Sequence, residues 1–326
     1  MKKRGAEKTD QSLSLFQISH ICTAYNIGEL INVLKQRKDT ANININIITE
    51  TGKYVIKLFT CNPERFDFIA DMLCKLQLEQ LPVLVPLKNN AGKYCVEVYP
   101  WMLQITKFVY GYPFMYSPIQ AMNSGKMLRR FHDALSDVES YVSPIASLYP
   151  SNDILVDAVG RLKGMGDEFP AQQIDSITRL YEEIIEKWET SCPELPQTII
   201  HGDWHQNNLI FNKDEDVCSI LDFDFMTRAE RIFDVAYALW RLRFSNDDKE
   251  LASAFMKGYG TLTDEEIEML PLEICRIVYY YICSSTLSLN PKYELTNHLK
   301  NHYQFLRWVM SEDGRNVVKD LCIIDK

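Results

Sequence analysis

The feature that most constrains the fold of this chain is the stretch from Thr198 to Leu239, where short apolar runs alternate with polar loops. The run TII at residues 198–200 leads into a polar loop, HGDWHQNN, at residues 201–208. Two strand-like pieces follow, at residues 209–212 and 217–222, and a charged turn separates them. The stretch therefore predicts a strand, a loop and a hairpin in succession.

Three side chains in this stretch offer oxygen atoms to a cation: Asp203, Asn208 and Asp222. Oxygen ligands suit Mg²⁺, which is usually held by one or two carboxylates together with the phosphates of a nucleotide. A hydroxyl group that attacks a phosphoryl group also needs a proton acceptor, and a carboxylate can serve. These residues predict phosphoryl transfer, with Asp203 as the base and Asn208 and Asp222 as magnesium ligands.

The segments HGDWHQNN, LDFDF and RIFDVAYAL resemble the aminoglycoside phosphotransferase-like family, which includes homoserine, choline and bacterial stress-response kinases and shares the protein-kinase fold. In that family the loop aspartate is the catalytic base, the loop asparagine and the later aspartate bind magnesium, and the last aspartate is structural. The resemblance gives these roles to Asp203, Asn208, Asp222 and Asp234. The match of three segments is specific, whereas HGD alone would be weak.

An aspartate-rich loop is more often a solvated turn than a metal site. The order and spacing of the three segments favour a functional site here. His201 is expected to be a hydrogen-bonded structural histidine. His205 and Trp204 are candidate substrate contacts, and filling the loop is the alternative role for both. Asp224 and Arg231, which follow the metal carboxylate, are further candidates for substrate binding, and Asp224 is also a candidate for a second metal.

Composition describes an ordinary globular chain of 326 residues, with 46% hydrophobic and 24% charged residues. A net charge of −9 argues against nonspecific nucleic-acid binding. The nine cysteines are scattered without a zinc-type pattern, which fits reduced thiols. No signal peptide and no stretch of transmembrane length is found, so we expect a cytoplasmic protein that does not bind membranes. The sequence leaves the oligomeric state open.

The N-terminal part predicts an antiparallel sheet with a helix. After a flexible tail at residues 1–10, a short helix is expected over residues 13–25. Strands are expected over residues 29–37, 42–48, 54–59, 81–86 and 94–100. In the second of these, asparagines alternate with isoleucines, which is typical of a half-buried strand.

The order of strands and helices in protein kinases indicates which positions of this chain would bind the nucleotide. Lys57, on the third strand, would hold the phosphates of ATP, although a lysine in a strand is usually an edge residue. Thr40 lies in the turn that would cover those phosphates. Glu97 and Tyr99 belong to a predicted hinge, residues 97–101, whose backbone would bind adenine. The helix Pro63–Leu78 should supply an acid to pair with Lys57, and we rank Asp71 ahead of the other two acids there, Glu64 and Asp67.

The C-terminal part reads as mainly helical. Helices are expected over residues 118–135, 153–163 and 174–190, with a break at residues 164–166, and over most of the chain after residue 247. Helix caps are expected at Thr263 and Pro271. His132 is predicted to be a satisfied buried histidine, and Asp234 a capping or loop-bracing carboxylate. Tyr279, Tyr280 and Tyr281 are more typical of core than of a cation cage.

We therefore predict an α+β, two-lobed protein-kinase-like fold, with an N-lobe at residues 11–96, the hinge at 97–101 and a helical C-lobe at 102–326. The resemblance implies transfer of the γ-phosphate of ATP to a small-molecule hydroxyl, with Mg²⁺ as cofactor. The expected acceptor is an amino alcohol related to homoserine, choline or an aminoglycoside, because a cationic amine suits an acidic lobe. The alternatives are a Ser/Thr protein kinase and a catalytically idle scaffold.

Overall fold

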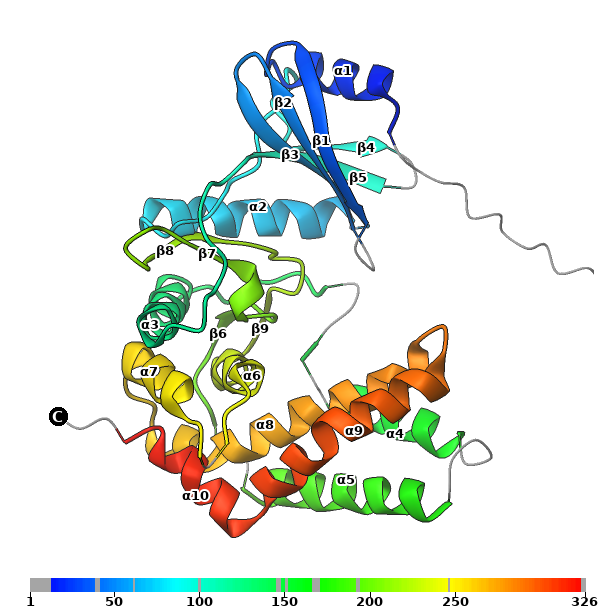
Figure 1. Cartoon of the computed structure of the whole chain (residues 1–326), viewed down its shortest axis with the longest axis vertical. Coiled ribbons are helices and arrows are strands. Elements are labelled where there is room, and N and C mark those ends of the chain that lie inside the picture. Colours follow the sequence, from blue (N-terminus) through cyan, green and yellow to red (C-terminus); the bar gives the residue numbers. More distant parts are fainter. Residues whose placement is uncertain are drawn as a thin grey trace, which may run out of the picture. The chain divides into compact units, whose positions relative to one another are not determined.

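The computed structural model describes residues 13–38, 42–60, 62–98, 101–144, 148–149, 152–165, 171–191, 194–245 and 247–323. The chain divides into two compact units (Figure 1). Unit 1 comprises Met1–Pro63 and Leu84–Val109, and unit 2 comprises Glu64–Val83 and Tyr110–Lys326. Within the described ranges, no helix is both long enough and apolar enough to span a lipid bilayer.

Unit 1 is an antiparallel sheet covered by one helix. Its elements are α1 (Leu15–Ala24), β1 (Leu30–Lys38), β2 (Ile43–Thr49), β3 (Gly52–Phe59), β4 (Cys95–Val98) and β5 (Trp101–Lys107). The strands lie in the order β1-β2-β3-β5-β4, and every neighbouring pair is antiparallel. Ile43, Ile45 and Ile47 of β2 are buried, and Asn44 and Asn46 are only partly buried, as the alternating sequence predicted.

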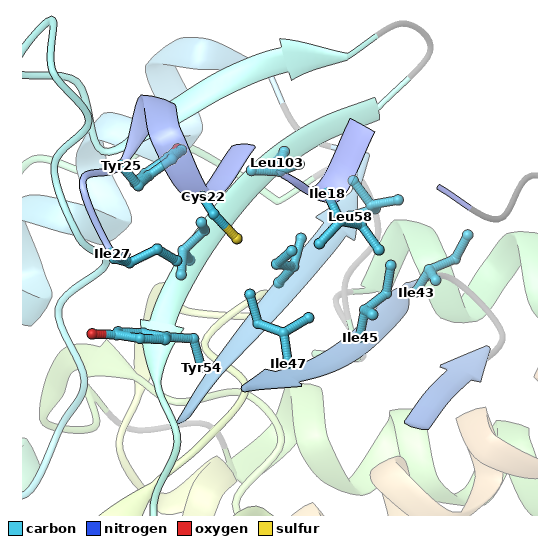
Figure 2. Close-up of a cluster of buried hydrophobic side chains, with 12 residues drawn as sticks. Ile18, Cys22, Tyr25, Ile27, Ile43, Ile45, Ile47, Tyr54, Leu58 and Leu103 are labelled. Carbon is cyan, nitrogen blue, oxygen red and sulfur yellow. The ribbon is translucent and has the colours of Figure 1, made fainter. Parts of the chain in front are cut away.

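The core of unit 1 lies between α1 and one face of the sheet. Ser14 and Gln17 form a capping box that starts α1. From this helix Ile18 and Cys22 pack against the buried side chains of the strands, among them Ile45 (Figure 2). The predicted helix over residues 13–25 is therefore confirmed, and its apolar face completes the core of the sheet.

The fifth predicted strand, at residues 94–100, corresponds to β4, but the fourth predicted strand is wrong. Residues 81–86 form no strand, and only an isolated bridge joins Val83 to Ile220. Pro82 and Pro86 explain this, because proline has no N–H group to donate to a sheet. The sheet instead contains β5, a strand that was not predicted. It lies between β3 and β4, and its Leu103 and Ile105 are buried.

The predicted hinge at residues 97–101 is also displaced. Its described residues lie at the end of β4 and the start of β5, where Val98 pairs with Trp101. The boundary between the units instead falls after Val109. The reason is that β5 contributes its apolar side chains to the core of unit 1, so the chain cannot leave that unit before β5 ends.

Unit 2 begins with α2 (Pro63–Leu78), which shares its first residue with unit 1. The other helices are α3 (Pro118–Ala134), α4 (Asn152–Lys163), α5 (Ala171–Ser191), α6 (Ile232–Leu242), α7 (Glu250–Tyr259), α8 (Asp264–Ser284), α9 (Pro291–Met310) and α10 (Glu312–Asp320), with two 3₁₀ turns, η1 (Gln206–Asn208) and η2 (Ser285–Leu287). Two antiparallel strand pairs accompany them: β6 (Gln197–Ile200) with β9 (Thr227–Glu230), and β7 (Leu209–Phe211) with β8 (Val217–Ile220).

The two predicted helix caps have different outcomes. Thr263 is the N-cap of α8 and forms a capping box with Glu266, which confirms the prediction. Pro271 is not a cap, because α8 continues through it to Ser284. Proline normally breaks a helix, but the flanking residues of α8 are buried, as Leu270 and Leu272 show, and their packing holds the helix together.

Candidate active site

The loop between β6 and η1 is held by one buried carboxylate, that of Asp234 in the first turn of α6. Asp234 Oδ2 accepts the backbone N–H of His201 at 2.7 Å, and Oδ1 accepts that of Gly202 at 2.9 Å. Oδ2 is also 3.0 Å from Nε2 of His132. A buried carboxylate is stable only when hydrogen bonds replace its hydration, and three donors do so here. The predicted loop-bracing role of Asp234 is confirmed.

His132 links this carboxylate to the surrounding helices. Its ring is 1% exposed, and Nδ1 lies 3.0 Å from the hydroxyl oxygen of Tyr259 in α7. Thr198 in β6 donates its hydroxyl to the backbone oxygen of His132 at 3.2 Å. His132 is therefore the satisfied buried histidine that the sequence predicted, and it joins α3, α6, α7 and β6 around the loop.

Replacing Asp234 with alanine is expected to lower the free energy of unfolding by about 3 kcal/mol or more, because each buried donor left unsatisfied costs about 1–3 kcal/mol. Urea unfolding of the purified variant measures this change. The control is Asp133→Ala, which removes an exposed carboxylate paired with Arg129 and should cost no more than about 1 kcal/mol. Equal losses in the two variants would contradict the bracing role.

Asp203, the predicted base, lies in the braced loop with its side chain 14% exposed. Asn208 Nδ2 donates to Asp203 Oδ2 at 3.0 Å and to the Asp203 backbone oxygen at 2.9 Å. His205 Nε2 lies 3.5 Å from Oδ1, and the hydroxyl of Tyr237 in α6 also hydrogen-bonds the carboxylate. These contacts fix the orientation of a carboxylate that remains partly open to solvent.

The electrostatics keep Asp203 ionised. Burial raises the pKa of its carboxyl group, but the hydrogen bonds from His205 and Tyr237 and the charge of His205 lower it more, and the net pKa lies below the ordinary value. Because its pKa lies below the ordinary value, the side chain of Asp203 is ionised at neutral pH. The ionised carboxylate can therefore accept a hydrogen bond from the hydroxyl group of a substrate. A protonated carboxyl group is a weaker acceptor.

His201 ties the catalytic loop to the segment that carries Asp222. Burial lowers the pKa of this histidine, so its ring is neutral. Nε2 donates to the backbone oxygen of Leu221 at 3.0 Å, and Nδ1 accepts the N–H of Asp203 at 3.3 Å. The N–H of Leu221 donates to the backbone oxygen of Asn208 at 2.8 Å. The residue before Asp222 is thus fixed on both sides, and His201 has the structural role that was predicted.

Asp222 itself has a left-handed backbone, with φ of 61°. Aspartate enters this region more readily than most residues, but the conformation still costs energy, and such residues concentrate at functional sites. The predicted magnesium ligands, Asn208 and Asp222, are therefore both held by the same short hydrogen-bonded loops. Because Nδ2 of Asn208 is engaged by Asp203, its Oδ1 is the atom left to coordinate a cation.

The donor set fits magnesium better than a metal that prefers nitrogen or sulfur. One carboxylate and one amide oxygen leave the other positions of an octahedral ion to phosphates and water, as Mg²⁺ usually requires. In the described part of the chain, no group of three or more His, Cys, Asp or Glu side chains is arranged to hold a metal ion.

The two loops approach closely at Gly202, whose φ is +79°. A Cβ atom on this residue would lie 2.4 Å from the backbone oxygen of Phe225. Only glycine accepts both the left-handed backbone and this short approach. Gly202 thus allows the loop of the predicted base to pack directly on the loop that follows Asp222.

Sequence reasoning missed Arg65, a buried arginine of α2 that is 1% exposed. Its guanidinium group donates to the backbone oxygens of Val142, Asp224 and Met226, two of which belong to the loop after Asp222. Arg65 therefore fixes that loop from the side of α2. The available signal was its position three residues before the buried Phe68, on the apolar stripe of the helix, where a charged residue needs a buried partner.

Two of the predicted substrate contacts, Trp204 and Arg231, are engaged by other residues of the chain. Trp204 is 1% exposed, donates Nε1–H to Ser124 Oγ at 3.1 Å and packs on Phe131. It fills the loop, which was the stated alternative. Arg231 forms two 2.7 Å hydrogen bonds to the carboxylate of buried Glu266, because that charge in the α8 capping box needs a counterion.

The remaining predicted site residues stay as predictions. Lys57 lies on β3 between Asn44 and Gln104 and is partly buried, and Glu97 is exposed on the edge strand β4. Asp71 is exposed on α2 and belongs to unit 2, whereas Lys57 belongs to unit 1. Thr40 and Tyr99 lie outside the described residues. His205 contacts Asp203, as given above, and the backbone oxygen of Asp224 accepts from Arg65.

Comparison with known proteins gives consistent results. A family model described as a phosphotransferase enzyme family matches residues 36–270. A homoserine kinase of Zymomonas mobilis is 26% identical over 270 residues, which cover 78% of this chain and 81% of the relative. A homoserine kinase of Neisseria meningitidis is 23% identical over 254 residues, covering 76% and 79%.

Solved structures resemble the whole fold. A microcompartment-associated aminopropanol kinase aligns with a TM-score of 0.73 at 15% identity, covering 92% of this chain and 99% of its own. A spectinomycin phosphotransferase, solved with ADP and spectinomycin, aligns with a TM-score of 0.62 at 15% identity, covering 95% and 98%. At this identity the likeness establishes the fold, and it confirms the predicted two-lobed, kinase-like α+β architecture.

Proposed function

Because this chain belongs to the phosphotransferase enzyme family, we propose that it uses ATP and Mg²⁺ to phosphorylate the hydroxyl group of a hydroxy amino acid or amino alcohol. The chain is a small-molecule kinase, as its curated relatives and its family membership indicate. The relatives cited above are homoserine kinases, and homoserine is therefore the first acceptor to test.

The observation that carries this proposal is the oriented, ionised Asp203 beside Asn208 and the loop of Asp222. In the proposed reaction the acceptor hydroxyl oxygen forms a bond to the γ-phosphorus of ATP, while the bond from that phosphorus to the bridging oxygen of ADP breaks. The hydroxyl proton passes to Asp203. A magnesium ion held by Asn208 and Asp222 would neutralise charge on the phosphates.

The proposed role of Lys57 is to hold the phosphates of the nucleotide, as its place on the third strand implies. We also propose a cytoplasmic location, which the reduced state of the described cysteines supports: Cys22, Cys74, Cys95, Cys218, Cys275, Cys283 and Cys322 are all free.

The test is ADP release from MgATP with homoserine, choline, an aminoglycoside and a generic protein as separate acceptors. We expect homoserine to be phosphorylated and the generic protein acceptor to remain unphosphorylated. Thermal unfolding with MgATP should also show stabilisation, by about 2.7 kcal/mol at a hundredfold excess over the dissociation constant. Phosphorylation of the generic protein acceptor and of no small molecule would favour the Ser/Thr kinase alternative. No turnover and no stabilisation by any nucleotide would favour the scaffold alternative.

A further inference from the structure

A cluster of aromatic and basic side chains lies beside the predicted base, at the C-terminal end of α6. Tyr237, which hydrogen-bonds Asp203, packs edge-on against Trp240, with 5.4 Å between ring centroids. The Trp240 ring lies 4.8 Å from Tyr281 in α8 and 5.6 Å from His302 in α9. A continuous path of side-chain contacts therefore runs from Asp203 to three helices of unit 2.

The cluster continues along α9. His298 stacks on Tyr281 with 4.6 Å between ring centroids and an angle of 8°, and its Nδ1 lies 3.2 Å from the Tyr281 backbone oxygen. His302 meets the same tyrosine ring edge-on at 5.4 Å. The side chains of Tyr281, His298 and His302 are all partly exposed, so this part of the cluster is in contact with solvent.

Two arginines at the end of α6 supply positive charge to this cluster. The Arg241 guanidinium carbon lies 5.6 Å from the centre of the Trp240 ring. Arg243 follows as the left-handed C-cap of α6, with φ of 55°. Among the residues that the structure describes, neither guanidinium group has a carboxylate partner within ion-pair distance, although the chain has more acidic than basic residues.

The electric field of these arginines extends across the cluster. Burial lowers the pKa of His302 to about 4, and the charges of His298, Arg243 and Arg241 contribute in the same direction. His302 is therefore neutral at pH 7 and can donate one hydrogen bond. Arg241 lies four residues after Tyr237 on α6, so its side chain projects from the same face of the helix as the residue that hydrogen-bonds the base.

An aromatic cluster near a kinase site could bind a ligand ammonium group through cation–π contacts. Here the arginines already provide cations, and a second positive charge would be repelled. An arginine that has no carboxylate partner among the described residues instead matches the planar, bidentate geometry of a ligand carboxylate. The cluster is therefore electrostatically suited to an anionic group and not to a cationic one.

We propose that Arg241, supported by Arg243 and His302, binds the carboxylate of the acceptor while its hydroxyl group contacts Asp203. The acceptor is then a hydroxy acid, and an amino alcohol without a carboxylate is a poor substrate. This inference rests on the proposed kinase function and narrows its substrate class. It also reverses the expectation that an acidic lobe selects its acceptor by a cationic amine.

The experiment compares homoserine with 3-aminopropan-1-ol, which is the same molecule without its carboxylate. Arg241→Gln should raise the KM for homoserine about 10- to 100-fold, as expected when a hydrogen-bonded charge pair is lost. The KM for ATP, and the kcat/KM for 3-aminopropan-1-ol, should change less than about twofold. Arg241→Lys should lie between wild type and Arg241→Gln, because lysine keeps the charge without the bidentate geometry.

Arg307→Gln is the matched control, since Arg307 is exposed on α9 outside the cluster, and we expect wild-type kinetics from it. An equal rise in KM for both acceptors would overturn the proposal, and a rise in KM for ATP instead would assign Arg241 to phosphate binding. Thermal unfolding in the presence of each acceptor alone separates the carboxylate site from the proposed kinase function. If no acceptor is phosphorylated, the proposed function fails, and stabilisation by homoserine that requires Arg241 would still support the carboxylate site. Without such stabilisation, the carboxylate site is also rejected.

Discussion

Asp203→Asn is expected to lower kcat by about 10²- to 10⁴-fold, the usual contribution of a positioned general base. Asparagine has nearly the same size and can still accept the hydrogen bond from Asn208, so the loop should keep its conformation. What it loses is the ability to take the hydroxyl proton. The KM for MgATP should therefore change little, because the defect appears in the chemical step and not in nucleotide binding.

Steady-state kinetics of phosphotransfer to homoserine measure this effect. Asp214→Asn is a matched control, because Asp214 is an exposed aspartate in the turn between β7 and β8, a few residues from the loop. Wild-type turnover in Asp203→Asn would remove Asp203 from the mechanism. A large rise in the KM for MgATP with unchanged kcat would instead assign this residue to nucleotide binding.

The second large effect is expected at Asp222. Removing its charge should lower turnover by about 10³-fold or more, because charge neutralisation by a metal ion contributes several kcal/mol to the transition state. The stabilisation by MgATP in thermal unfolding should disappear in the same variant. Asp222→Asn is the better substitution, since asparagine tolerates the left-handed backbone at this position and alanine does not.

Comparing Asp222→Asn with Asp222→Ala separates metal binding from backbone strain. Both variants should lose the magnesium-dependent stabilisation, but only Asp222→Ala should also unfold more easily in the absence of nucleotide. Asp222→Asn with normal turnover, or with normal stabilisation by MgATP, would show that Asp222 is not a metal ligand.

The sequence predicted the local elements around the candidate site because their signals are local. The loop HGDWHQNN, the hairpin after it and the helix containing Asp234 each lie within a few residues of one another, and their turn and apolar patterns are plain. The predictions that failed depend on contacts between distant segments. Neither the pairing of β5 between β3 and β4 nor the ion pair of Arg231 with Glu266 leaves a local pattern.

Other misses have a similar cause. The strand β9 is a four-residue element that forms because β6, thirty residues earlier, offers it a partner at Ile200↔Thr227 and Gln197↔Glu230. Arg65 leaves no pattern of the kind that an acid paired with Lys57 would leave on this helix. A charged residue on an apolar stripe is the more general signal, since burial of that charge requires a partner wherever it lies.

The bracing of the loop by Asp234 changes what survival of the motif can mean in other proteins of this fold. His201, Gly202 and Asp234 maintain the shape of the chain, through the hydrogen bonds and the close approach described above. A descendant that had lost all catalysis would still need them in order to fold. In the same loops, the carboxylate and amide groups of Asp203, Asn208 and Asp222 are instead the groups that the proposed phosphoryl transfer requires, although the left-handed backbone of Asp222 still favours aspartate or asparagine there. A scaffold and an enzyme with this fold are therefore told apart by these three positions, and the histidine, the glycine and the helix aspartate are uninformative.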